Sequence, residues 1–261
     1  ESLMHNGITL QSATSHYFGQ KFSKPFDVKF LNKENKLENV YQTSWGFSTR
    51  AMGGLIMVHG DDNGLVLPPK IAPTKVAIIP IGNDEKVLAK CEEINNLLKS
   101  NDITTILDNS DRSAGFKFAE YEMQGIPVRI ELGKRDLDSG VITVVRRDTS
   151  QKQQLATDEN LVLNITKLFD TIQTDMFNAA KRRMEEKTFE AHNLEDIKRI
   201  TSTNPGFIKA MWCGNKECEE EIKKINGTKS RCIPFKQEVI DDKCVCCGKK
   251  AKHLVIWGIQ Y

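Results

Sequence analysis

The stretch Lys75–Gly82, KVAIIPIG, decides the fold of the middle of the chain. Its apolar side chains follow one another almost without a break, a pattern typical of a strand that is buried on both faces of a parallel sheet. Asn83–Ser100 comes next and carries apolar residues at helical spacing, with Asn83 placed to cap the helix. A buried strand followed at once by an amphipathic helix predicts an α/β domain.

The same alternation continues toward the C-terminus. ITTILD (103–108) is a second strand pattern, and SAGFKFAEYEMQG (113–125) is a helix pattern that Gly125 can close. IPVRIEL (126–132) and GVITVVRRD (140–148) predict two further strands. The resulting order, βαβαββ, indicates a compact domain with a mixed sheet.

The segments before and after this α/β pattern differ from it in residue composition and pattern, so we expect three domains. Residues 1–72 carry Gly, Trp and His in irregular places and end at a proline-rich turn, which stops regular structure. Residues 73–170 hold the α/β pattern. Residues 171–261 start inside a long amphipathic helical pattern and finish with a cysteine-rich region and a short apolar strand.

Composition restricts the class of protein. Of the 261 residues, 39% are hydrophobic, which suffices for real cores, and no apolar run reaches the length of a membrane-spanning helix. The formal net charge is only +2, so any nucleic-acid surface must be a local patch. The start lacks both an initiator Met and a signal-peptide pattern, so we expect a fragment or a processed chain.

Seven cysteines are present, and six of them lie between Cys213 and Cys247. An odd, clustered set argues against an extracellular disulfide framework and favours a metal site in a reducing compartment. Two spaced pairs supply four thiolates for a tetrahedral zinc ion (Zn2+): Cys213, Cys218, Cys244 and Cys247. Four thiolates leave no open coordination position, which predicts a structural rather than a catalytic ion.

Two alternatives stay open in this region. Cys246 lies two residues after Cys244 and could replace Cys247 as the fourth ligand, although Gly248 favours a zinc-knuckle turn after Cys247. Free buried thiols are the simpler alternative, but two spaced pairs seldom arise by chance. Cys232 stands alone among apolar neighbours, so we expect it to be buried packing.

Two stretches near the N-terminus suggest nucleotide chemistry. LQSATSHYFGQKF (10–22) and QTSWGFSTRAMGGLIMVHGDDNGLVLPP (42–69) include Arg50, whose planar guanidinium can pair with phosphate or stack on a base. Together with FAEYEMQGIPVRIELGKRD (118–136) and VRRDT (145–149), they resemble prolyl-tRNA synthetases essentially from end to end. The stretch around Arg50 resembles motif 3 of the class II synthetases.

This resemblance implies a multidomain protein of α/β and α+β class. Residues 1–72 would be the C-terminal part of an antiparallel-sheet class II catalytic domain. Residues 73–170 would be the anticodon-binding domain, and residues 171–261 the small α+β zinc domain of the eukaryotic and archaeal type. Motifs 1 and 2 of the family are expected upstream of Glu1, so the chain would hold the back half of the catalytic core.

The resemblance also implies an activity, namely ATP-dependent activation of L-proline and its transfer to tRNA(Pro), with Mg2+ accompanying ATP. It gives Arg50 the part of the catalytic cation. ATP contacts are implied for Gln11, Ser48 and Arg50, proline contacts for His16, Ser44, Trp45 and Gly46, and anticodon contacts for Glu122, Arg129 and Lys152. Taken singly, each of these residues also has an ordinary explanation, such as a surface arginine or an exposed helical acid.

Two functional hypotheses follow. The main one is a cytoplasmic enzyme of this family, a homodimer through its catalytic core, in which an N-terminal half accompanies the present chain. The chain alone would then be inactive. The alternative is a non-catalytic module that binds tRNA or another partner, because motifs 1 and 2 lie outside the sequence.

Overall fold

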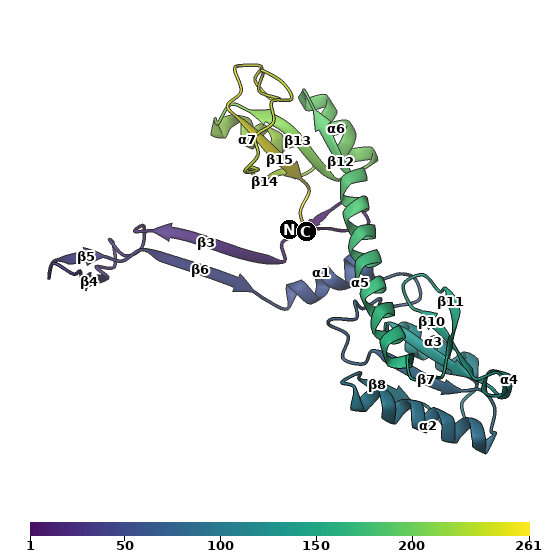
Figure 1. Ribbon diagram of the computed structural model, residues 1–261. Coiled ribbons are helices and arrows are strands. Elements are labelled where there is room, and N and C mark those ends of the chain that lie inside the picture. Colours follow the sequence, from purple (N-terminus) through teal and green to yellow (C-terminus); the bar gives the residue numbers. More distant parts are fainter. The chain divides into compact units, whose positions relative to one another are not determined.

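The computed structural model describes residues 1–261, which form two compact units. One unit is His59–Arg183, and the other combines Glu1–Val58 with Met184–Tyr261. Figure 1 labels the helices and strands of both units. Neither unit contains a helix with the length and apolar character that crossing a membrane requires.

The unit His59–Arg183 is built on a five-stranded mixed sheet. In spatial order its strands are β11 (Lys152–Ala156), β10 (Val141–Arg146), β9 (Val128–Leu132), β7 (Val76–Pro80) and β8 (Thr105–Leu107). β7 pairs in parallel with β8 and β9, whereas β10 pairs antiparallel with β9 and β11. The mixed sheet expected from the sequence is therefore present.

Helices pack on both faces of this sheet (Figure 1). They are α2 (Glu85–Ser100), α3 (Ala114–Met123), α4 (Lys134–Asp138) and α5 (Leu161–Glu186), which continues past the end of the unit. Every residue of β7 is buried, with Val76 and Ile78 in the core formed with α2 and α5, and Ala77 and Ile79 in the core beneath α3. Burial on both faces explains why this strand has an unbroken apolar sequence.

Several details differ from the expectation. Asp84, not Asn83, caps α2, because its carboxylate accepts a hydrogen bond from the Lys86 amide at 2.8 Å. The helix α4 and the edge strand β11 were not expected; the sequence of β11 is mostly polar and four of its five residues are exposed. Cys91 is part of the core, and burial raises the pKa of its thiol to about 11.

Met184–Tyr261 contains a second sheet of four strands. Its spatial order is β12 (Thr188–Ala191), β13 (Phe207–Trp212), β15 (His253–Gly258) and β14 (Lys229–Cys232). Helices α6 (Leu194–Thr203) and α7 (Lys216–Lys223) contribute to a core that includes the fully buried Trp257. Beyond β15 the chain end pairs with Thr9, whose carbonyl accepts a hydrogen bond from the Tyr261 amide at 3.0 Å.

Glu1–Val58 contains three separate antiparallel strand pairs. They are β1 (Ser2–Leu3) with β2 (Thr9–Leu10), β3 (Ala13–Gly19) with β6 (Gln42–Phe47), and β4 (Lys29–Leu31) with β5 (Leu37–Asn39). Helix α1 (Arg50–His59) follows β6 and starts at the arginine singled out in the sequence.

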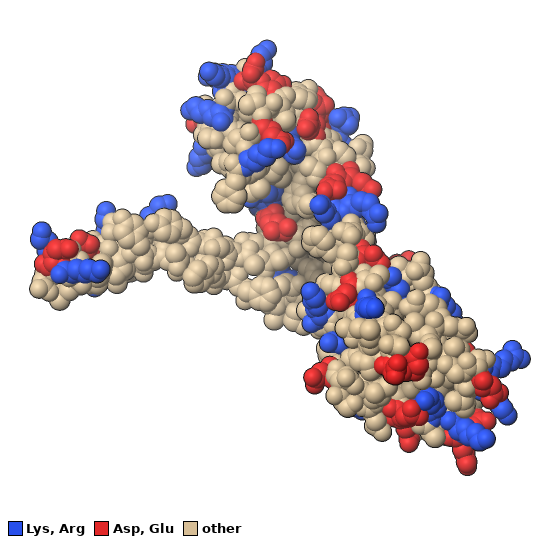
Figure 2. All heavy atoms as spheres, in the orientation of Figure 1, with Lys and Arg blue, Asp and Glu red and all other residues tan.

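The expected antiparallel sheet of a class II catalytic domain is not formed by this part of the chain. Both faces of the β3–β6 ribbon are largely exposed, and the side chains of Trp45 and Phe47 are 77% and 80% exposed. Figure 2 shows the ribbon almost entirely in tan, with charged residues gathered at its β4–β5 end. A two-stranded ribbon cannot bury either face by itself, so the strands remain separate pairs without a core.

Candidate nucleic-acid interface and metal centre

Glu122, Arg129 and Lys152, the predicted anticodon contacts, come from three elements of one unit. Glu122 lies in the last turn of α3, Arg129 in β9, and Lys152 at the start of β11. Val145 of β10 pairs with Arg129 on one side and with Lys152 on the other, so these positions form one row across the sheet. Paired residues project to the same face of a sheet, so Arg129 and Lys152 share one face, and α3 packs on that face and adds Glu122.

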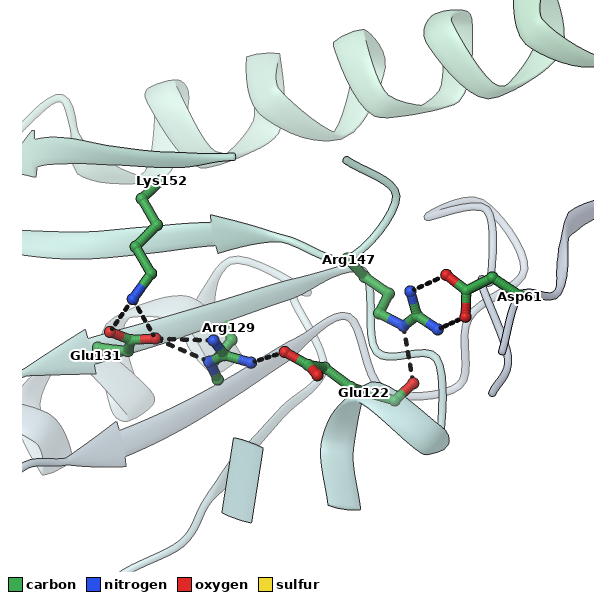
Figure 3. Close-up of polar contacts among 6 residues, drawn as sticks. All are labelled: Asp61, Glu122, Arg129, Glu131, Arg147 and Lys152. Carbon is green, nitrogen blue, oxygen red and sulfur yellow. Dashed lines mark hydrogen bonds and ion pairs between the residues drawn. The ribbon is translucent and has the colours of Figure 1, made fainter. Parts of the chain in front are cut away.

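Glu131 links them into a chain of alternating charges, drawn in Figure 3. Arg129 donates from Nη1 to Glu122 Oε1 at 2.6 Å, and from Nε and Nη2 to Glu131 Oε1 at 3.0 and 2.9 Å. Lys152 Nζ donates to Glu131 Oε2 at 3.1 Å. The Arg129 guanidinium also lies over the Phe118 ring, 4.0 Å from its centroid.

The solvent exposure of the side chains differs along this series of ion pairs. The side chains of Arg129 and Glu131 are 10% and 12% exposed, whereas those of Glu122 and Lys152 are 36% and 57% exposed. The buried Arg129 and Glu131 form a fixed support, and the Glu122 carboxylate and the Lys152 amine face solvent at its two ends. Glu131 is not among the residues predicted from the sequence, although VRIEL carries a signal for it. Two opposite charges lie two residues apart, on the same face of an otherwise apolar strand.

Arg147, also missed, holds the backbone beside Glu122 (Figure 3). Its Nε donates to the Glu122 carbonyl at 2.8 Å, and its Nη1 and Nη2 donate to the two carboxylate oxygens of Asp61 at 2.8 and 2.6 Å. The Arg147 side chain is only 4% exposed. Its hydrogen bonds are the main reason why the pKa of Asp61 lies below the ordinary value for an aspartate.

A groove of about 490 Å³ opens beside Lys152, between β11 and α5. Most of the residues that line it are polar, and they include Lys152 and Lys167, but the Lys152 amine itself is bonded to Glu131. Arg146, which also contributes, is already neutralised because it is paired with both Asp148 and Asp175. Lys167 is therefore the cation of this groove that could bind a phosphate.

Gln11, Ser48 and Arg50, the residues expected at an ATP site, also lie together. Arg50 Nη1 donates to Gln11 Oε1 at 3.5 Å, and the Arg50 amide donates to Ser48 Oγ at 3.4 Å. Arg50 is the exposed first residue of α1, where backbone amides point out of the helix end. An arginine at a helix N-terminus presents positive charge that suits an anionic ligand.

The residues expected to contact proline are only partly brought together. His16 of β3 pairs directly with Ser44 of β6, and Gly46 is two residues further along the same face. Trp45 lies between them in sequence, so its side chain projects from the opposite face of the ribbon. The ribbon by itself does not make Trp45 a wall of a pocket containing His16.

The four predicted metal ligands converge at one point near the end of the second sheet. Cys213 follows β13, Cys218 lies in α7, and Cys244 and Cys247 come from the turn before β15. All four sulfur atoms lie within 4.8 Å of one another, with Cys213 Sγ 3.7 Å from Cys218 Sγ and 3.8 Å from Cys247 Sγ. Sulfur atoms about 2.3 Å from a tetrahedral zinc ion would be about 3.8 Å apart, so the geometry and the donor type fit zinc.

The turn that carries the second pair bears on whether Cys246 or Cys247 is the fourth ligand. The Gly248 amide donates to the Cys244 carbonyl at 3.0 Å, and Gly248 has a φ of +68°, which a residue without a Cβ adopts readily. The Lys249 amide stabilises the Cys247 thiolate and lowers the pKa of that thiol to about 7. Cys246 is not among the four converging sulfur atoms.

Cys232 does not have the environment expected for it. The prediction of a buried packing residue is wrong, because Cys232 is exposed at the end of β14. β14 is an edge strand of its sheet, so the apolar neighbours in the sequence do not enclose the thiol. Cys232 also lies outside the cysteine cluster.

Comparisons with known proteins match both of these regions. A family model described as "Anticodon binding domain" matches residues 75–167, which cover the five-stranded sheet and the Glu122–Lys152 chain. A second family model, described as "Prolyl-tRNA synthetase, C-terminal", matches residues 194–261, which include all four converging cysteines.

Several curated relatives align with the whole of this chain. Proline–tRNA ligase from Clostridium novyi is 50% identical over 100% of this chain and 54% of its own length. The protein of that name from Lachnoclostridium phytofermentans is 49% identical, and proline–tRNA ligase 2 from Bacillus cereus is 50% identical, again over 100% of this chain. The chain spans about half the length of these curated relatives. It belongs to the prolyl-tRNA synthetase family, of which it represents a C-terminal part.

Proposed function

We propose that this protein is a proline–tRNA ligase, which activates L-proline with ATP and transfers it to tRNA(Pro). In this proposal the chain supplies motif 3, the anticodon-reading surface and a zinc domain. The observation that carries it is the series of ion pairs from Glu122 to Lys152, on a domain that matches an anticodon-binding family model. The residues in the middle of the series are buried, and those at its two ends are exposed. Such a support fixes hydrogen-bonding groups before the ligand arrives, which lowers the entropy cost of binding.

The exposed ends suit the edge of an unpaired base. Glu122 keeps Oε2 for a ligand while Oε1 is held by Arg129. A carboxylate accepts hydrogen bonds from the N1–H and N2–H2 groups of guanine, and an amine or guanidinium donates to O6 and N7. Guanines are shared by the proline anticodons, so Glu122 and Lys152 would read guanine edges. Arg129 would act chiefly by holding Glu122 in place.

The remaining roles concern the chemical step. Arg50, assisted by Gln11 and Ser48, would contact ATP, and its fixed charge would stabilise negative charge that develops at the phosphates. Mg2+ would accompany ATP, as it does in most phosphoryl chemistry. His16, Ser44, Trp45 and Gly46 would contact proline once the β3–β6 ribbon is covered by the rest of the catalytic domain.

The cysteine cluster would hold one zinc ion, Zn2+. Its ligands would be Cys213, Cys218, Cys244 and Cys247, a proposal supported by sulfur atoms that all lie within 4.8 Å of one another. A bound ion would cross-link β13, α7 and the turn before β15. With all four positions taken by thiolates, its contribution is to the stability of this region.

We assign the domains as residues 1–72 for the end of the catalytic domain, 73–170 for anticodon binding and 171–261 for the zinc domain. The protein would act in the cytoplasm as a homodimer, together with an N-terminal half that completes the catalytic core. The exposed aromatic residues of the ribbon, such as Trp45 and Phe47, support the existence of such a covering surface.

The test compares two reactions of the full-length protein: proline-dependent ATP–pyrophosphate exchange and charging of tRNA(Pro). Glu122→Ala and Lys152→Ala should each weaken charging by about 1–3 kcal/mol in kcat/KM while exchange stays close to that of the parent. Glu92→Ala, which removes an exposed glutamate of α2, is the matched control. An equal fall in exchange would contradict anticodon reading, and a parent that binds tRNA(Pro) without any exchange would favour the non-catalytic alternative.

A further inference from the structure

The sequence His59–Leu67, HGDDNGLVL, contributes nothing to the chemistry assigned above, yet it is built into the edge that carries Glu122. We propose that Asp61 and Arg147 are positioning residues for anticodon reading: together they fix the end of α3 so that Glu122 presents its carboxylate to a base. This inference rests on the proposed role of Glu122.

All three nitrogen atoms of the Arg147 guanidinium donate hydrogen bonds that hold this edge. Two parallel hydrogen bonds join it to Asp61, and a third, from Nε, joins it to the Glu122 carbonyl at 2.8 Å. Arg129 meanwhile holds the Glu122 carboxylate at 2.6 Å. Glu122 is therefore anchored at both ends, its backbone by Arg147 and its side chain by Arg129. Residues locked in this way hold a binding geometry more accurately than free side chains do.

Asp61 is needed because Arg147 is almost fully buried, with 4% of its side chain exposed. A buried cation without a counter-charge is unfavourable, and it would tend to move toward water. Asp61 is itself fixed by a tight turn, since the Asn63 amide donates to its Oδ1 at 2.9 Å and the Gly64 amide donates to its carbonyl at 3.1 Å. The turn thus holds Asp61 in place to receive Arg147.

The backbone on both sides is packed too closely to be incidental. The Leu65 amide donates to the Met123 carbonyl at 3.0 Å, and the Leu67 amide donates to the Gly125 carbonyl at 3.3 Å. A Cβ on Gly64 would lie 2.6 Å from the Met123 backbone, and a Cβ on Gly125 would lie 2.6 Å from the Leu65 Cβ. Both glycines also have positive φ values, +127° and +73°. The segment therefore fits the end of α3 only with these two glycines.

If the Asp61–Arg147 link were purely structural, it would stabilise the domain without affecting which base is read. The test therefore measures discrimination between bases. In the full-length protein, kcat/KM for charging is compared between tRNA(Pro) and a transcript whose anticodon guanines are replaced by adenine. Adenine lacks the N1–H and N2–H2 donors that a carboxylate would bind. The variants are Asp61→Asn, Arg147→Lys and Glu122→Gln, with Asp62→Asn as the matched control, because Asp62 is exposed and makes no ion pair.

We expect Glu122→Gln to lower the preference for guanine by about tenfold. Asp61→Asn and Arg147→Lys should lower it by several-fold through a higher KM for tRNA, and by more than any change in ATP–pyrophosphate exchange. Asp62→Asn should match the parent. The double variant Asp61→Asn/Glu122→Gln should be no worse than Glu122→Gln alone, because both changes act on the same contact.

The outcomes distinguish the role of Glu122 from the positioning role of Asp61 and Arg147. If Glu122→Gln keeps the parent's discrimination, the proposed function of Glu122 is wrong and this inference falls with it. If Glu122→Gln loses discrimination while Asp61→Asn keeps it, the positioning role alone is wrong. The positioning role is also wrong if the losses of discrimination in Asp61→Asn and Glu122→Gln multiply in the double variant. Should Arg147→Lys fail to fold, as judged by circular dichroism, Asp61→Asn at the more exposed partner still decides the question.

Discussion

Glu131 binds Arg129 through a single carboxylate oxygen: Oε1 accepts from Nε at 3.0 Å and from Nη2 at 2.9 Å. This arrangement leaves Oε2 for Lys152, which donates to it at 3.1 Å. One buried acid therefore neutralises a buried cation and also orients an exposed one. The position of Lys152 at the proposed RNA surface depends on a residue that itself faces the interior.

We predict that Glu131→Gln destabilises the centre of the sheet by about 2–3 kcal/mol, because it leaves the buried Arg129 without its main counter-charge. All three tryptophans lie outside His59–Arg183, so their fluorescence does not report on this unit. Hydrogen exchange at the amides of β9 and β10 measures the effect directly. Glu92→Gln should leave hydrogen exchange unchanged. Protection in Glu131→Gln equal to that of the parent would contradict the importance of the Glu131–Arg129 ion pair.

We predict that one zinc ion copurifies per chain and that Cys213→Ser, Cys218→Ser, Cys244→Ser and Cys247→Ser each lose it, because each removes one of four converging thiolates. Cys232→Ser and Cys246→Ser are the matched controls and should keep the metal. Metal content by mass spectrometry is the measurement. Loss of zinc in Cys246→Ser with retention in Cys247→Ser would show that Cys246, and not Cys247, is the fourth ligand.

Loss of the ion should also loosen the second sheet. Trp212 precedes the first cysteine and packs edge-on against Trp257, with ring centroids 6.4 Å apart. Tryptophan fluorescence during urea unfolding should therefore show an earlier transition in the four ligand variants than in the two controls. Equal midpoints in all six variants would argue that the cluster does not hold this region together.

We predict that Arg50→Ala lowers proline-dependent ATP–pyrophosphate exchange by at least about a hundredfold, since it removes a fixed charge from the proposed triphosphate site. Arg50→Lys should recover only part of the loss, because an ammonium cannot reproduce the planar fork. Circular dichroism should match the parent, as the side chain is exposed and its bond to Gln11 is long, at 3.5 Å. Exchange close to the parent value would remove Arg50 from the active site.

The sequence was sufficient where local pattern and tertiary environment agree. β7 is apolar throughout because both of its faces are buried, and the spacing of Ile165, Leu168, Phe169, Ile172 and Met176 in α5 follows the single face that enters the core. The cysteine pairs were visible for a similar reason, since each pair of ligands lies on one turn or one short segment.

Long-range pairing was not visible. β11 has no apolar alternation, because an edge strand needs only the hydrogen bonds of β10 to form. Glu131 and Arg147 gain their importance from partners on other elements, Lys152 and Asp61, that spacing along the chain does not connect. The β3–β6 ribbon shows the reverse case, in which residues expected in one pocket, His16 and Trp45, are separated by the alternation of the strand itself.

We predict that the link between Asp61 and Arg147 weakens in acid. Hydrogen bonds from Arg147 hold the pKa of Asp61 below its ordinary value of about 3.9. Because the folded-state pKa is depressed, the ionised carboxylate stabilises the Asp61–Arg147 link above pH of about 4, and this contribution is lost as the pH falls through the lowered value. Asp61→Asn lacks the titrating group. Protection of the Leu65 and Leu67 amides, which bond to the end of α3, should therefore be higher in the parent than in Asp61→Asn at neutral pH. The difference should shrink as the pH is lowered below about 4, whereas Asp62→Asn should follow the parent throughout. Hydrogen exchange corrected for the intrinsic rate at each pH measures this difference. A parent–variant difference that stays constant into acid would mean that Asp61 contributes through hydrogen bonds that do not depend on its charge.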